Sequence, residues 1–196
     1  MDFRALSFRQ VPHQPKLFLD YLDHFEKVKS FYVHPPAMTA VTRTARKLGY
    51  PDDRRAEVTS ILRGQNIALG AGAETLSNLD RLEKGAVAIV SGQQVGLFSG
   101  PAYSIYKALT AVQIAEEMTR GGIPAVPVFW MATEDHDLDE VRHATWFDQG
   151  KLVRFELPAT AEMGRPVGRI PLGTQVEPLV EAAAEMLANQ GSDLLA

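Results

Sequence analysis

The chain has 196 residues, of which 45% are hydrophobic and 22% charged, with a formal net charge of −4; these values are typical of a globular protein. The charge excludes a general attraction to nucleic acid or acidic membranes, and no stretch approaches the roughly 20 apolar residues of a membrane span. With no cysteine, disulfides, thiolate metal sites and a cysteine nucleophile are excluded, and a cytoplasmic protein without nucleic-acid or membrane partners is expected.

The first 85 residues are predicted to be helical, from the spacing of apolar residues and the positions of glycine and proline. Asp52 and Asp53 are typical capping residues at the start of one of these helices. The predicted helices cover residues 16–32, 38–50, 52–70 and 73–85.

The pattern changes at residue 86. The run AVAIV (86–90) is wholly apolar, which predicts a strand covered on both faces, as in a parallel sheet. A loop, a helix over 102–118 and a second strand over 125–131 follow, and this order predicts one parallel strand–helix–strand unit. A third strand is expected at 151–157 and a last helix at 176–189. The apolar stripe of the central helix is expected to consist of Ile105, Ala108, Leu109, Val112 and Ala115.

These elements predict an α/β protein. Residues 86–196 are expected to form the first part of a Rossmann-like three-layer core, and residues 1–85 a helical N-terminal layer. Ligands of such folds bind beyond the carboxyl ends of the strands. Two polar segments follow the two predicted strands, so both are expected at that edge of the sheet.

The first of these segments is SGQQVGLFSGP, residues 91–101. Its glycines would let backbone N–H groups approach an anion at the start of the next helix, and Lys107 would lie one turn further on. Gln93 and Gln94 add amide donors and acceptors. The glycines are equally consistent with a turn that serves only backbone geometry, and the segment is neither a phosphate-binding P-loop nor a dinucleotide fingerprint.

The second segment, TEDHDLDE (133–140), places five carboxylates and His136 directly after a strand. Three interpretations are open. Thr133, Glu134 and Asp135 could cap a helix that begins near Asp137, with the remaining acids solvated. On a helix, His136, Glu140 and His143 would share one face and could hold a metal. Alternatively, the carboxylates could hold an amine or a sugar, with His136 as an acid, a base or a phosphate contact.

Together, the two segments and the helix between them resemble the bacillithiol biosynthesis cysteine-adding enzymes, the BshC family. That family carries a GQQxGLxTGP-like loop, a lysine-bearing helix and an FWxAxEDHDxxE-like segment. Ser99 stands here where threonine is usual. The matching residues are Gln93, Gln94, Gly96, Leu97, Gly100, Pro101, Lys107, Phe129, Trp130, Ala132, Glu134, Asp135, His136, Asp137 and Glu140.

The resemblance implies a ligase that adds L-cysteine to glucosaminyl-malate, the last step toward bacillithiol. Kinship of the family with nucleotidyltransferases implies ATP activation, and no metal bound by the protein itself is expected. The catalytic residues would be His136, Asp137 and Glu134. The substrate- or anion-binding residues would be Gln93, Gln94, Ser99, Gly100, Lys107, Trp130 and Asp135.

Family members are more than twice as long as this chain. The resemblance therefore implies a piece that is inactive alone, with a homodimer contact in a region absent here. Two other functions remain open at this point: a metal-dependent hydrolase that uses His136, Glu140 and His143, and a non-catalytic small-molecule-binding domain.

Overall fold

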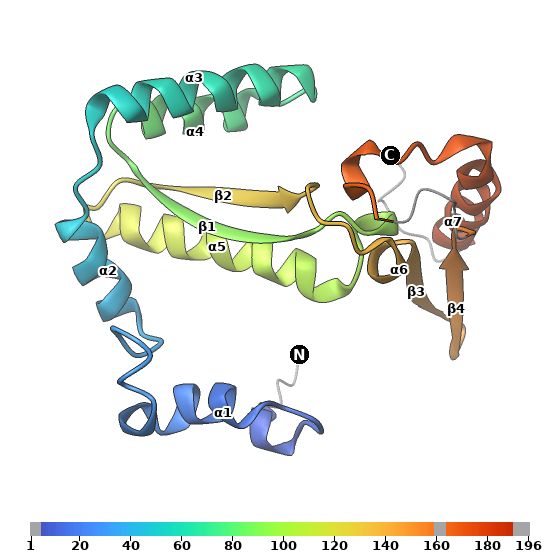
Figure 1. Ribbon diagram of the computed structural model, residues 1–196, viewed down its shortest axis with the longest axis horizontal. Coiled ribbons are helices and arrows are strands. Elements are labelled where there is room, and N and C mark those ends of the chain that lie inside the picture. The colour runs from blue at the N-terminus through green and yellow to red at the C-terminus, as the bar shows by residue number, and fades with distance from the viewer. Residues whose placement is uncertain (1–4, 159–163, 190–196) are drawn as a thin grey trace. The chain divides into compact units, whose positions relative to one another are not determined.

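The computed structural model describes residues 5–158 and 164–189. The chain divides into two compact units. The helical unit comprises Met1–Val87 and Met118–Pro124, and the sheet unit comprises Ala88–Glu117 and Ala125–Ala196. Figure 1 labels the elements of both. In the part of the chain that is described, no helix is both long enough and apolar enough to cross a membrane.

The helical unit begins with α1 (Lys16–Asp23), which is shorter than the predicted helix over 16–32. A short 3-10 turn follows, and the chain folds back so that the rings of Tyr21 and Tyr32 lie 4.5 Å apart. In a continuous helix these two residues would be separated by about 16 Å along the axis. The aromatic contact therefore replaces the second half of the predicted helix.

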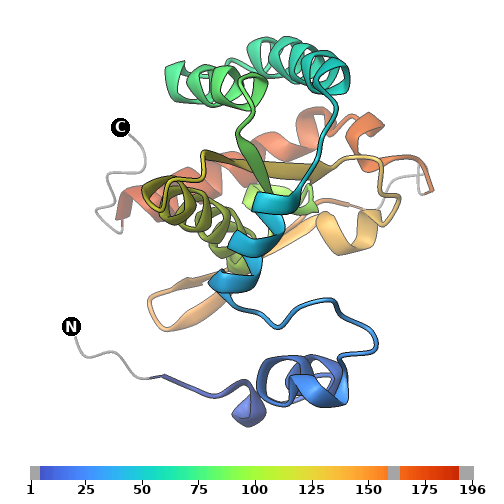
Figure 2. The ribbon, with the colours of Figure 1, turned by 90° about the vertical axis from the view of Figure 1, so that its left-hand side faces the viewer.

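The other three predicted helices are confirmed as α2 (Met38–Lys47), α3 (Asp52–Ala68) and α4 (Ala73–Glu83). The proposed caps are wrong, because α3 starts after Pro51 without a side-chain cap and both aspartates lie in its first turn. Figure 2 shows α3 and α4 side by side.

The α3–α4 pair is held by both packing and charge. Leu79 and Leu82 of α4 are buried, and Arg63 of α3 forms an ion pair of 2.6 Å with Asp80. The Arg55 guanidinium donates to two backbone oxygens, those of Leu82 and Ala86, at 3.0 and 3.1 Å. These bonds tie α3 to the segment that leads into the first strand.

The sheet unit contains the predicted strand–helix–strand. Strands β1 (Val87–Gln94) and β2 (Ala125–Ala132) pair and run in the same direction, and α5 (Ala102–Arg120) connects them (Figure 1). The α/β class is thus confirmed. The first strand is longer than predicted and includes Gln93 and Gln94, so these residues are strand residues rather than loop residues.

The predicted burial of α5 is wrong in part. Ile105, Leu109 and Val112 were expected in the apolar stripe, but they are 53%, 51% and 37% exposed. The helix buries Ala111, Ala115 and Met118, and of these only Ala115 was predicted in the stripe.

The third predicted strand exists as β4 (Lys151–Glu156), but it does not join β1 and β2. It pairs antiparallel with β3 (His143–Asp148), which the sequence analysis missed. Gln149 and Gly150 make the turn between them, both with positive φ (45° and 82°), which matches the twist of a two-residue hairpin. The predicted last helix is confirmed as α7 (Glu177–Asn189).

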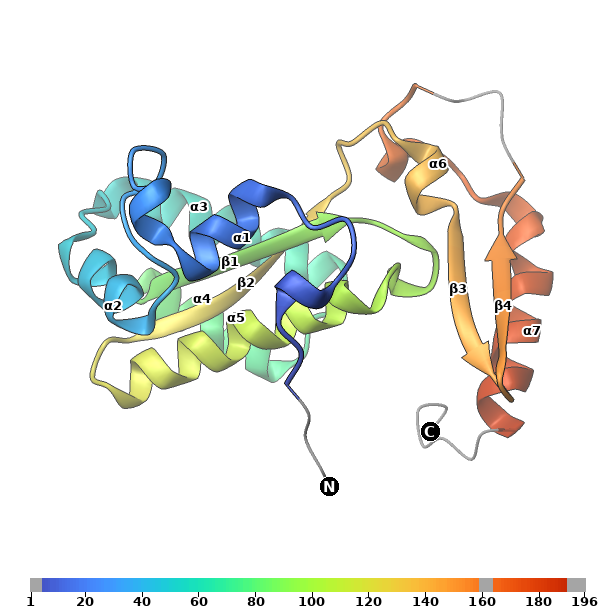
Figure 3. The same ribbon diagram turned by 90° about the horizontal axis from the view of Figure 1, so that it is seen from below.

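A small core joins the hairpin to α7, which lies beside β4 in Figure 3. Phe155 of β4 is buried together with Ala183 and Met186 of α7. Phe98, from the segment after β1, contacts the rings of Trp146 and Phe155 at 5.4 and 5.3 Å. The β3–β4 hairpin therefore packs against Phe98 and holds the end of the first polar segment in place.

Gly92→Ala is expected to destabilise the protein by about 1–3 kcal/mol, because a Cβ atom there has no room. It would lie 2.7 Å from the Trp130 carbonyl oxygen and 2.9 Å from the Trp130 Cβ. The matched control is Gly64→Ala in α3, where a Cβ meets nothing within 4 Å and alanine should stabilise the helix by about 0.5–1 kcal/mol. Urea unfolding of both variants measures the change in the free energy of unfolding. Equal changes would contradict the close approach of β1 to β2 at Gly92.

Candidate functional site

The two polar segments of the sequence meet directly in the sheet unit. The Gln94 side chain, at the end of β1, donates from Nε2 to Asp135 Oδ2 at 2.9 Å and to Glu140 Oε2 at 2.8 Å. Asp135 and Glu140 both follow β2 in the chain. This contact confirms that the segments share one edge of the sheet. The two segments are also hydrogen-bonded directly to each other through Gln94.

A chain of hydrogen bonds extends this contact back to α5. The Lys107 ammonium donates to Gln93 Oε1 at 2.9 Å, and Gln93 Nε2 donates to Gln94 Oε1 at 3.0 Å. Gln93 Nε2 also lies 3.1 Å from the hydroxyl of Tyr103, one turn before Lys107. Each amide thus accepts on the side of the lysine and donates on the side of the carboxylates. This order fixes the orientation of both glutamines and links one cation to two anions.

The glycines of the first segment are explained by contacts within the chain. A Cβ at Gly96 would lie 2.7 Å from the Cα of Gly100, and Gly100 itself has φ 69° and ψ −151°, which only glycine adopts readily. Phe98 and Ser99 between them also have positive φ. The loop is therefore a tight turn anchored by Phe98, and its glycines are no evidence for an anion cradle. Ser99 is exposed.

Several carboxylates of the acidic segment accept hydrogen bonds from nearby N–H groups. Asp137 caps α6 (Leu138–Val141) by accepting from the Glu140 N–H at 3.1 Å. Oδ1 of Asp135 accepts from the N–H groups of His136 and Asp137 at 2.6 and 3.2 Å. Glu134 Oε1 accepts from the Trp130 indole at 3.2 Å. The helix start near Asp137 is thus confirmed, but its cap is Asp137 itself and not Thr133, Glu134 or Asp135. Asp135 Oδ2 and Glu140 are left facing Gln94.

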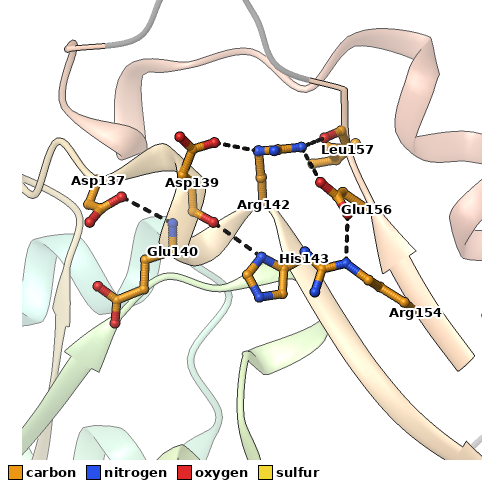
Figure 4. Close-up of polar contacts among 8 residues, drawn as sticks. All are labelled: Asp137, Asp139, Glu140, Arg142, His143, Arg154, Glu156 and Leu157. Atoms are coloured by element: carbon orange, nitrogen blue, oxygen red, sulfur yellow. Dashed lines mark hydrogen bonds and ion pairs between the residues drawn. The ribbon is translucent and has the colours of Figure 1, made fainter. Parts of the chain in front are cut away.

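The remaining acid of the segment belongs to a network that fixes the hairpin (Figure 4). Arg142 pairs with Asp139 at 2.7 Å and with Glu156 at 2.6 Å, and it donates to the Leu157 carbonyl at 2.7 Å. The Arg154 hydrogen bond, and next the charges of Arg154 and Arg142, hold the pKa of Glu156 below its usual value. The network therefore holds α6 against β4.

The helical metal face considered as one alternative for His136, Glu140 and His143 does not form, because α6 covers only Leu138–Val141. His136 precedes this helix, and His143 begins β3 with its Nδ1 3.1 Å from the Asp139 carbonyl (Figure 4). Residues 5–158 and 164–189 contain no group of three or more His, Asp or Glu side chains placed to hold a metal ion. The absence of a bound metal stays a prediction.

Of the predicted site residues, the structure joins Gln93, Gln94, Lys107 and Asp135 in one hydrogen-bonded chain. The His136 side chain is exposed beside this chain. Asp135 accepts a hydrogen bond from the backbone N–H of His136 and not from its ring. The sequence places Tyr103 on one helix face with Lys107, but Tyr103 was not counted among the site residues. The partnership of Glu140 with Gln94 was missed.

Gln94→Ala is expected to raise the pKa of Asp135 toward its ordinary value. The Gln94 amide is the main cause of the lowered pKa, followed by the N–H groups of Asp137 and His136. A lowered pKa in the folded state stabilises the protein above about pH 4, the ordinary value, and this contribution is lost as the pH falls through the folded pKa. Carbon NMR titration of the carboxyl group measures the pKa. The control Gln113→Ala, at an exposed position of α5, should leave the pKa of Asp135 unchanged.

Comparison with known proteins gives a consistent result. Residues 1–193 match the model of the bacillithiol biosynthesis BshC N-terminal Rossmann-like domain. A protein of Koribacter versatilis named "Putative cysteine ligase BshC" is 40% identical over 186 residues, which are 94% of this chain and 35% of that protein. Proteins of the same name from Solibacter usitatus and Salinibacter ruber are 42% and 35% identical over 88% of this chain and 32% of their own lengths. The chain thus spans about a third of these relatives.

Proposed function

The chain belongs to the bacillithiol biosynthesis BshC family through its N-terminal Rossmann-like domain, and from this premise we propose that the full-length protein joins cysteine to glucosaminyl-malate in the last step of bacillithiol synthesis. The names of the homologues support a ligase, and the bond formed would be a carbon–nitrogen amide. The observation that carries the proposal is the contact of Gln94 with Asp135 and Glu140, because it assembles both family segments into one site.

The acidic side of this site suits the amine substrate. An ammonium ion is attracted by the carboxylates of Glu134, Asp135 and Glu140, which lie in one segment of the chain. Its nitrogen must lose a proton before it can attack the carboxyl carbon of cysteine. The exposed imidazole of His136 is the side chain that would take this proton. The new C–N bond then forms as the bond from that carbon to its leaving group breaks.

ATP, which the family kinship implies, would activate the cysteine carboxylate by giving it a leaving group. The residues of the hydrogen-bonded chain do not fit a triphosphate by themselves, because Lys107 is the one cation among them and it already donates to Gln93. The carboxylates of Asp135 and Glu140 at the other end of this chain would repel the phosphates. The cations that hold ATP would therefore come from the rest of the full-length protein.

The test uses a full-length chimera, in which residues 1–193 of this chain replace the matched region of the Koribacter versatilis relative. The chimera, the relative and the 196-residue chain are each incubated with cysteine, glucosaminyl-malate and ATP. Mass spectrometry is expected to detect the amide with the first two and not with the third. A folded chimera that binds glucosaminyl-malate but forms no product, beside an active relative, would instead indicate a non-catalytic binding domain.

A further inference from the structure

Residues 166–170, which we call the docked segment, lie along the acidic segment. The N–H of Val167 donates to the Asp135 carbonyl oxygen at 2.7 Å, and the N–H of Gly168 donates to the Thr133 carbonyl oxygen at 2.9 Å. These bonds join two stretches of backbone that are far apart in the sequence. The docked segment therefore borders the candidate site, although it lies outside both family motifs.

The docked segment is held closely against the acidic segment. Ile170 is buried together with Leu138 and Val141 of α6. A Cβ atom at Gly168 would lie 2.7 Å from the Cβ of Thr133, which is closer than the Cβ atoms of real side chains approach. Backbone pairing and apolar packing thus fix the place of the docked segment at the site.

The docked segment brings a cation to this place. Arg169 directly follows Gly168, and adjacent Cα atoms are about 3.8 Å apart, so Arg169 begins beside the acidic segment. Its side chain is exposed, and within the described part of the chain it has neither a hydrogen bond nor an ion pair. Arg142, at the end of α6, instead donates to two carboxylates and a backbone carbonyl. Arg169 therefore remains able to bind an anionic group of a substrate.

The chemistry of the amine substrate requires such a cation. In glucosaminyl-malate the amine and the malyl group are attached to neighbouring carbon atoms of the sugar, so both carboxylates of malate accompany the amine. The carboxylates of Asp135 and Glu140 attract the amine but repel the malyl group. We propose that Arg169 binds a malyl carboxylate of the substrate while the acidic segment holds the amine. This inference rests on the proposed function and adds a residue that selects for the malyl group.

Two other anionic groups fit this arginine less well. The carboxylate of cysteine is the reacting group and loses its charge when it is activated, whereas the malyl carboxylates stay charged throughout. A triphosphate carries several negative charges, and Arg169 is one cation beside several carboxylates. A guanidinium group pairs with a single carboxylate through two parallel hydrogen bonds, which matches one end of malate.

Calorimetric titration of the full-length chimera tests this assignment with two ligands, glucosaminyl-malate and methyl glucosaminide, which has the amine but no malyl group. Arg169→Ala is expected to weaken the binding of glucosaminyl-malate roughly 10- to 100-fold, the range for loss of a hydrogen-bonded ion pair. The binding of methyl glucosaminide should stay unchanged. Arg169→Lys should recover part of the loss, because lysine keeps the charge but not the planar fork. Arg43→Ala, at an exposed position of α2, is the matched control and should change neither affinity.

Gly168→Ala provides a second measurement that leaves the arginine in place. The added Cβ has no room against Thr133, so the docked segment should move and the affinity for glucosaminyl-malate should again fall selectively. Equal binding of glucosaminyl-malate by the parent and by Arg169→Ala would refute the proposal. An equal loss for both ligands, or a folded parent chimera that does not bind glucosaminyl-malate, would refute it too.

The titration requires no turnover, so its result is separate from that of the activity test. A chimera that binds glucosaminyl-malate through Arg169 but forms no amide would refute the proposed ligase and support the malyl site. A chimera that forms the amide and binds glucosaminyl-malate equally well without Arg169 would support the ligase and refute the malyl site.

Discussion

Replacement of His136 by alanine in the full-length chimera is expected to lower the rate of amide formation roughly 10²–10⁴-fold, the usual range for loss of a general base. The neighbouring Asp135 bonds the backbone of His136 and leaves its imidazole exposed. The ring is thus held at the edge of the acidic segment without being used for structure. If it takes the proton of the attacking amine, the carboxylates of this segment replace it poorly, because a carboxylate, with an ordinary pKa of about 4, is a much weaker base than an imidazole.

The fold should survive this change. Substitutions at exposed positions usually alter the free energy of unfolding by no more than about 0.5 kcal/mol, so the thermal melt of the variant should match that of the parent chimera. His24→Ala, also at an exposed position, is the matched control and should retain full activity. Near-normal product formation by a well-folded His136→Ala variant would show that the segment only starts a helix.

The sequence was sufficient for the elements whose pattern is local. The strand–helix–strand follows from two apolar runs and a long helical segment, and the structure confirms all three. The β3 strand was missed because its partners lie outside residues 143–148: it pairs with β4 and packs on Phe98, 48 positions before Trp146. Trp146 of β3 packs on Phe98 and Phe155, at ring distances of 5.4 and 5.2 Å, and neither contact is visible in the spacing of residues 143–148.

The candidate site could likewise be predicted where topology decides it, but not where it depends on contacts between residues far apart in the chain. The placement of both segments at one sheet edge follows from topology, which a single crossover connection dictates. The bond between Gln94 and Glu140 does not, because it joins residues 46 positions apart and depends on where α6 begins. The helical spacing of His136 and Glu140 was misleading for the same reason: Asp137 caps the helix between them, so that His136 lies outside it.

Gln94→Glu in the chimera is expected to reduce amide formation by about 10²-fold at neutral pH, the cost of a misplacement of roughly 1 Å in a catalytic site. The change removes the N–H groups that Gln94 gives to Asp135 and Glu140. It also places a new negative charge against two existing ones, so the acidic segment should move away from β1. The matched control is Gln113→Glu, the same substitution at an exposed position of α5, which should leave the rate unchanged.

The pH dependence of this variant separates positioning from a general loss of stability. The two neighbouring carboxylates should raise the pKa of the introduced carboxyl group above its ordinary value of about 4.3. As the pH is lowered toward that raised pKa, the group becomes neutral and regains one donor for Asp135 or Glu140. The ratio of variant to parent rates should therefore increase between pH 8 and about pH 5.5. A ratio that stays constant over this range, in a variant that melts like its parent, would show that the Gln94 contact does not position the acidic segment for the reaction.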